Sequence, residues 1–419
     1  MSPLTKLKPP DHRRYIMAID DFPIRLPRTP QIQHFALLAG LDAAVRGSLI
    51  SVMPLVVHEA MGSTQGSSKV YFFVGIVSLI WGLMVPWANR LLPRRWMYTC
   101  GGVMYLIGMT LALLGTPLSV ALSLGCNAMA TVTIFVCFNA YVMDYVERSS
   151  LGRSQSLQMF YAAAPWAIGP MLGVWLHNTW WPLPFVMAGF FATALITVFW
   201  ILRLGNGKQI TRAAGPAVNP LAYLGRFFAQ PRLIVGWLFA CIRSTGWWVY
   251  VVYLPYFCIE QGLGNNVGSV ALSISNSMLF AAPFLLRFAR RSSVRVSVRW
   301  AFALCGGLFL VASLVAPWPW LTVGAMMLAS VLLVTLDIVG GLPFLMSVKP
   351  SERTEMSAVY SSFRDVSSIV TPGMAWAVLY VAPTAAIFAT TAGLMALAWT
   401  IAGKLHPRLG TPRPSRAQP

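Results

Sequence analysis

The sequence predicts an all-α membrane protein whose twelve spanning helices form two pseudo-symmetric six-helix bundles, with both termini in the cytoplasm. Three observations lead to this fold class: an apolar composition, the spacing of the apolar segments, and the distribution of basic residues. The 419 residues are 57% hydrophobic and only 10% charged, with a mean hydropathy of +0.65. Soluble domains carry about 25% charged residues, so most of this chain is expected to avoid water.

Spanning helices need about 20 predominantly apolar residues each, and twelve segments of the chain meet that requirement. Their ends are predicted to within about four residues. The segments lie at about 31–57, 69–89, 96–115, 118–146, 155–177, 183–203, 232–258, 267–288, 298–316, 320–347, 356–380 and 382–403.

Basic residues occupy alternate loops of this twelve-helix topology. The N-terminus, the C-terminal tail and every second loop hold nearly all of them, while the opposite loops hold a single one, Lys69. Because Lys and Arg concentrate on the cytoplasmic side of membrane proteins, both termini are predicted to lie inside, in a multi-pass protein of the inner (plasma) membrane. The net charge of +19 is therefore interpreted as a topology signal and not as a nucleic-acid footprint.

The two halves of the chain repeat several features in the same order. Arg-Trp followed by Cys-Gly-Gly occurs at 95–102 and again at 299–307, and Pro followed five residues later by Glu occurs at 54–59 and 255–260. Such repeats predict two halves related by an axis along the membrane normal. The predicted divisions are an N-terminal segment (1–30), a first bundle (31–203), a cytoplasmic linker (204–231), a second bundle (232–403) and a basic tail (404–419).

The loop between the second and third predicted helices carries a recognisable motif. It reads Asn-Arg-Leu-Leu-Pro-Arg-Arg at 89–95, and with the topology it resembles the Major Facilitator Superfamily (MFS) along essentially the whole chain. The basic positions of the family motif match Arg90, Arg94 and Arg95, whereas its acid is replaced by Asn and its glycine by Leu. The resemblance implies that Asp144 engages Arg90 and locks the outward-facing state; the alternative is a solvated carboxylate at a helix end.

A second motif lies in the predicted helix at 155–177. Gly169, Pro170 and Gly173 resemble the Gly-Pro element of the family's antiporters, although Pro165 replaces one of its upstream glycines. This resemblance implies the drug/proton-antiporter branch. Since proline removes a backbone donor and glycine permits close helix contact, a kink and close packing are expected here.

Six charged residues lie well inside predicted spans, where each costs about 2.5–3.5 kcal/mol unless it has a partner or a water-filled cavity. The resemblance implies that the first, fourth, seventh and tenth helices line a central cavity, and four of the six fall on such helices. We predict that these residues bind substrate or couple protons. They are Asp42, Arg46, Arg243, Asp337, Arg364 and Asp365.

The spacing of these charges predicts their partners in part. Asp42 and Arg46 are four residues apart on one helix face and can pair, which is either functional or merely self-neutralising. Asp337 has no basic residue at helical spacing, so it is either protonated or paired across the cavity with Arg46 or Arg243. Adjacent residues point about 100° apart on a helix, so Arg364 and Asp365 are expected to seek other helices, as in a gate.

Aromatic residues follow Arg243 closely. Trp247, Trp248 and Tyr250 are candidate cavity residues, because such rings give apolar area with a polar handle and attract cations. The alternative is that they pack against neighbouring helices or lipid.

These patterns predict a secondary active transporter that exports a small amphipathic or anionic organic solute by alternating access, in exchange for protons. No cofactor is expected beyond the proton gradient, no metal or catalytic residue is expected, and the partners are a small-molecule substrate and the lipid bilayer, for a monomer that binds no nucleic acid. Import by proton symport and lipid or lysolipid flipping are the alternatives. A membrane-embedded enzyme and a non-transporting receptor remain as further classes.

Overall fold

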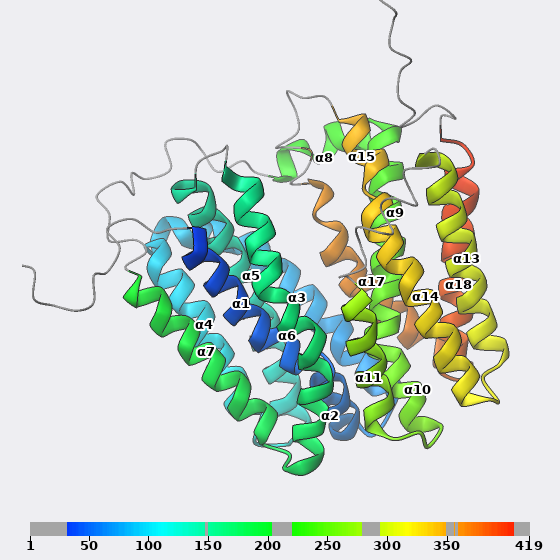
Figure 1. Cartoon of the computed structure of the whole chain (residues 1–419), viewed down its shortest axis with the longest axis horizontal. Coiled ribbons are helices and arrows are strands. Elements are labelled where there is room, and N and C mark those ends of the chain that lie inside the picture. The colour runs from blue at the N-terminus through cyan, green and yellow to red at the C-terminus, as the bar shows by residue number, and fades with distance from the viewer. Residues whose placement is uncertain are drawn as a thin grey trace, which may run out of the picture.

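The computed structural model describes residues 32–146, 150–202, 220–278, 294–348, 356 and 359–405. Within these ranges all regular elements are helices and no strand occurs (Figure 1). The all-α fold class predicted from the composition is confirmed.

Helices of the first half extend from residue 32 to residue 201. They are α1 (Ile32–Leu49), α2 (Val52–Met61), α3 (Thr64–Leu91), α4 (Arg94–Ala112), α5 (Pro117–Tyr145), α6 (Leu151–Thr179) and α7 (Leu183–Ile201).

Helices of the second half begin at residue 220. They are α8 (Pro220–Phe228), α9 (Pro231–Trp248), the π-helical η2 (Val249–Tyr253), α10 (Leu254–Glu260), α11 (Asn265–Ser277), α13 (Val294–Leu314), α14 (Pro319–Val339), α15 (Leu342–Ser347), α17 (Phe363–Val378) and α18 (Ala385–Ala402).

Each of the twelve predicted spans contains at least one of these helices. Nine stretches of the described residues are long and apolar enough to cross a bilayer. Of the other three, α11 and α17 are described over 13 and 16 residues, and α4 begins with two arginines. The count of twelve remains a prediction, as does the position of the termini, which lie outside the described residues.

Helix starts follow from local sequence. In α5, the Thr116 hydroxyl accepts from the Ser119 backbone N–H and the Ser119 hydroxyl accepts from that of Thr116, so two backbone donors that the helix leaves free are satisfied reciprocally. Proline opens α5, α9 and α14, where its missing N–H costs nothing and its φ is already helical.

Proline also explains where three of the predicted spans are interrupted. A proline cannot donate to the carbonyl four residues earlier, and its ring crowds that carbonyl. Ile50, four residues before Pro54, separates α1 from α2; Val251, four before Pro255, lies in η2; and α14 ends at Val339, four before Pro343. By contrast, α6 continues as one helix through Pro165 and Pro170.

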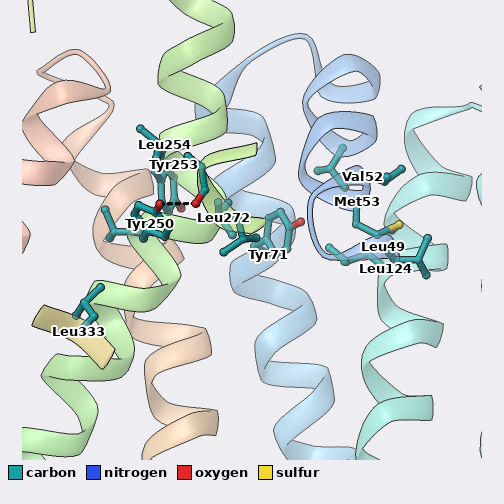
Figure 2. Close-up of a cluster of buried hydrophobic side chains, with 14 of the residues drawn as sticks. Leu49, Val52, Met53, Tyr71, Leu124, Tyr250, Tyr253, Leu254, Leu272 and Leu333 are labelled. Carbon is teal, nitrogen blue, oxygen red and sulfur yellow. Dashed lines mark hydrogen bonds between the residues drawn. The ribbon is translucent and has the colours of Figure 1, made fainter. Parts of the chain in front are cut away.

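The first-half and second-half helices lie on opposite sides of Figure 1, and contacts between them join α3 to α17, α6 to α11 and α2 to α10. One buried cluster runs through both halves. Figure 2 shows part of it, with Leu49, Val52 and Met53 from the first half and Tyr253 and Leu254 from the second.

Polar contacts also join the halves, at the end of the molecule that carries α2 and α10. The Tyr253 hydroxyl donates to Ser68 over 3.0 Å, and the Asn178 amide donates to Asn266 over 2.8 Å. Thr64 donates to the Glu260 carboxylate. Helices α8 and α15 lie at the opposite end of the molecule (Figure 1).

Candidate functional site

The first-half charges form the pair that their spacing predicts. On α1, Nη2 of Arg46 lies 2.8 Å from Oδ2 of Asp42. The hydroxyl of Tyr105, on α4, lies 3.1 Å from Oδ1 of the same carboxylate and 2.9 Å from the Thr131 hydroxyl of α5. The Arg46 guanidinium lies over the Trp166 ring of α6, 5.4 Å from its centroid. Four helices therefore hold this ion pair.

The second-half charges pair between two helices. Nε of Arg243, on α9, lies 2.9 Å from Oδ1 of Asp337, on α14. The Nε–H does not point along this contact, which is therefore an ion pair more than a hydrogen bond. One turn along α9, the Trp247 indole donates to Oδ2 over 2.9 Å. Of the two arginines considered for Asp337, the structure places Arg243 beside it.

Arg364 and Asp365 lie at the start of α17. The Arg364 guanidinium lies 5.8 Å from the ring centroid of Phe135, on α5 of the other half, and 5.6 Å from that of Phe363. Its charged neighbours are Arg243, Arg46, Asp365 and Asp337. The charged neighbour of Asp365 is Arg364 itself. Within the described part of the chain, neither residue forms a salt bridge.

These contacts define what we call the central cluster, which draws charged side chains from α1, α9, α14 and α17 together. The Asp337 side chain keeps 37% of its surface accessible, although it projects from an apolar helix. The members of the central cluster are Asp42, Arg46, Arg243, Asp337 and Arg364.

The three aromatic candidates separate in the structure. Trp247 contacts the central cluster through Asp337. Trp248 packs edge-on against Tyr71 of α3, with 6.0 Å between ring centroids. Tyr250 is buried, and its hydroxyl bonds to Ser275 over 2.6 Å and to the backbone carbonyl of residue 271. The latter two rings pack between helices, and a role of these residues in the cavity remains a prediction.

At the loop motif, Arg94 forms a salt bridge with Asp144, linking α4 to α5. The Arg94 guanidinium also lies over the Tyr141 ring, 5.5 Å from its centroid. Arg90, the expected partner of Asp144, has a side chain outside the described residues; Arg95 stands beside Arg94 in the first turn of α4. The motif and Asp144 are thus neighbours, and the role of this contact as a lock remains a prediction.

Because half of the Asp144 side chain is exposed, its salt bridge is expected to contribute little to stability. Asp144→Asn should lower the free energy of unfolding by about 1 kcal/mol or less. Thermal unfolding of the purified variant measures this, with Arg94→Gln and the double variant completing a cycle. A loss of several kcal/mol would contradict it, while a transport defect without a stability loss would support the lock.

The Gly-Pro motif lies where α6 packs most closely on α1. A Cβ at Gly169 would lie 2.5 Å from the carbonyl carbon of Gly47, and one at Gly173 would overlap the carbonyl oxygen of Ser48. A Cβ at Gly47 would lie 2.5 Å from the carbonyl oxygen of Pro165. These glycines let two helix backbones touch, as small residues do in membrane proteins.

Sequence reasoning did not select four residues of this site: Tyr105, Thr131, Phe135 and Trp166. They carry no charge, and apolar helices contain many such residues. Each lies inside a predicted span, but nothing in the sequence sets these four apart from the other uncharged residues of the same spans.

Elsewhere, an apolar depression of about 510 Å³ lies between α13 and α14. Its lining includes Leu308, Val311, Trp320 and Leu321 and no charged residue, so it is separate from the central cluster. Among the described residues, no group of three His, Cys, Asp or Glu side chains could hold a metal ion.

An all-helical chain with at least nine apolar spans and a charged cluster between two halves has the architecture of a membrane transporter. The sequence profile of the Major Facilitator Superfamily matches residues 35–372. The chain therefore belongs to the Major Facilitator Superfamily and is a multi-pass membrane transporter of that type, not an enzyme.

Solved structures of transporters share this fold at low sequence identity. The nucleoside transporter NupG superposes with a TM-score of 0.69 at 14% identity, covering 90% of this chain and 100% of that one. The POT family transporter PepTSo gives 0.68 at 12%, covering 89% and 97%. A bacterial homologue of the iron transporter ferroportin, in the inward-facing state, gives 0.65 at 13%, covering 89% and 96%. No curated protein sequence matches the chain.

Proposed function

We propose that this transporter moves a small amphipathic or anionic organic solute across the inner membrane by alternating access, exporting it in exchange for protons. One observation carries the proposal: each half contributes an aspartate–arginine pair to a single cluster. These pairs are Asp42 with Arg46 and Asp337 with Arg243. The protein acts as a monomer without a cofactor, because one chain supplies both halves and the proton gradient supplies the energy.

Both aspartates have the same kind of surroundings. Each forms a salt bridge with one arginine and accepts a hydrogen bond from one neutral ring donor, the Tyr105 hydroxyl for Asp42 and the Trp247 indole for Asp337. Protonation removes the negative partner of the arginine. The guanidinium is then left uncompensated in a poorly solvated place, which favours binding of a substrate anion in its stead.

The replacement of an aspartate by a substrate anion can change the side of the membrane from which the site is accessible. The polar contacts at the α2 and α10 end join the halves in the present conformation. Access from that end requires them to separate. A solute or proton that changes how the two pairs attract one another would shift the balance between this conformation and one that is open at the α2 and α10 end. A ligand shifts such an equilibrium by the difference between its affinities for the two conformations.

The proposal is tested in two stages. A thermal-shift screen of the purified protein against a solute library identifies stabilising compounds, because a ligand of the folded state raises the unfolding temperature. Counterflow in proteoliposomes and a lumenal pH dye then measure transport. We expect the hits to exchange across the membrane and to move protons in the opposite direction. Solute and protons moving in the same direction would favour import by symport, and phospholipid flipping would favour a flippase.

A further inference from the structure

Arg364 differs from the other two arginines of the central cluster. Arg46 and Arg243 each face an aspartate at 2.8–2.9 Å. Arg364 has five N–H donors and, within the described residues, contacts two aromatic rings in place of an acceptor: Phe135 and Phe363. The side chain lies beside the charged groups of the central cluster and is exposed, so a ligand can reach it. It is the member of the cluster whose hydrogen-bonding capacity is left for a ligand.

The charges around Arg364 strengthen this conclusion. Its charged neighbours are the arginines Arg243 and Arg46 and the aspartates Asp365 and Asp337, and among the described residues it forms a salt bridge with neither aspartate. The nearest carboxylate along the chain, Asp365, stands in the first turn of α17, where a negative charge is already favoured by the positive end of the helix dipole. Three guanidinium groups therefore converge with two of them neutralised, which leaves room for one further negative charge.

The surroundings of this position are aromatic. Phe135 keeps 51% of its surface accessible while its ring lies beside Arg364, although it projects from the opposite half. On α6, Trp166 lies beneath Arg46, and on α9, Trp247 borders Asp337. Flat rings beside a guanidinium suit a planar solute that stacks on them.

We propose that the central cluster binds a solute with a single anionic group, carboxylate or phosphate, attached to an aromatic ring. Arg364 binds the anionic group and Phe135 contacts the ring. This inference rests on the proposed function and narrows its substrate class. Because Arg364 belongs to the second half and Phe135 to the first, such a solute bridges the two halves. Its binding therefore favours the relative position of the halves in which both residues contact it.

The first experiment measures thermal stabilisation of the full-length protein in detergent by five probes. Benzoate and phenyl phosphate carry a ring and an anionic group, benzamide carries a ring without charge, benzylammonium carries a ring and a positive charge, and acetate carries the anionic group alone. We expect benzoate or phenyl phosphate to stabilise the protein. The other three probes should need at least tenfold higher concentrations for the same rise in unfolding temperature. The stronger of the two anions identifies the preferred group.

Variants then assign the residues. Arg364→Gln is expected to weaken binding of the preferred anion by at least tenfold, Arg364→Lys by less, and Phe135→Leu to weaken it without changing the preference for anions. The matched control is Arg299→Gln on α13, where an arginine lies over the Trp399 ring at 4.9 Å away from the cluster. If Arg364→Gln fails to fold, Arg364→Lys and Phe135→Leu carry the test.

Three outcomes of the probe comparison would overturn the inference: equal stabilisation by benzamide, preference for benzylammonium, or no stabilisation by either aromatic anion. Wild-type affinity in both Arg364 variants would also overturn it. Proton-coupled flux of a neutral or cationic solute would contradict this substrate class and leave the carrier mechanism standing. Binding of benzoate without any flux would contradict the carrier mechanism and leave the inferred ligand class standing.

Discussion

Asp337→Asn is expected to leave the protein folded and to reduce proton-driven transport to the level of protein-free liposomes. The amide keeps the size of the side chain and can still accept from Trp247, which lies 2.9 Å away. It cannot bind a proton or neutralise Arg243. Because the Asp337 side chain is 37% accessible but that of Arg243 only 11%, the lost ion pair should lower the free energy of unfolding by about 1–3 kcal/mol, between the values of exposed and buried pairs.

Two assays separate these effects in proteoliposomes. Solute flux driven by a pH gradient should vanish in Asp337→Asn, while counterflow without a gradient persists if substrate binding survives. Glu59→Gln is the matched control, since Glu59 is a half-exposed acid whose contact, 3.6 Å from His177, lies at the α2 end. Gradient-driven flux in Asp337→Asn at the unmodified rate would refute proton coupling at this residue.

Gly173→Ala is expected to produce the largest loss of stability among single-methyl additions. The new Cβ would overlap the Ser48 carbonyl oxygen, and that atom belongs to the backbone of α1, which cannot move as a side chain would. Overpacking at such a contact costs about 3 kcal/mol. The unfolding temperature of the purified protein and its yield from membranes measure the loss.

Gly125→Ala provides the matched control for this substitution. Gly125 lies within α5 and a Cβ there meets nothing within 4 Å. Alanine is favoured over glycine in a helix by roughly 0.5–1 kcal/mol, so this variant should be equally or more stable. If both glycine variants behave alike, the close approach of α1 and α6 contributes nothing to stability.

The sequence was sufficient for features that depend on one helix at a time. Spans follow from apolar length, and the Asp42–Arg46 pair follows from the four-residue spacing of one helix face. The three interruptions also have a local cause, since each lies four residues before a proline, but the same rule fails in α6, which continues through Pro165 and Pro170. Local rules of this kind need no knowledge of which helices are neighbours.

Features that depend on packing between helices could not be predicted in the same way. The choice of Arg243 for Asp337 depends on how α9 lies against α14, and the choice of Arg94 for Asp144 depends on the register of α4 and α5. Nor does the sequence show that Tyr105 and Trp166 surround the first ion pair, because uncharged residues in apolar helices carry no positional signal. The resemblance to a family limited the possible folds but did not predict these contacts between side chains.

The contacts that join the two halves at the α2 and α10 end have a consequence for the conditions in which the carrier can work. They are donated by hydroxyl and amide groups, and among those between described residues the Thr64 contact alone ends on an ionisable acceptor, Glu260. Dissolved ions screen charge–charge attraction and leave contacts between neutral groups almost untouched. Opening at this end should therefore proceed at a similar rate in dilute and in saline media, which suits a cell whose surroundings change in ionic strength.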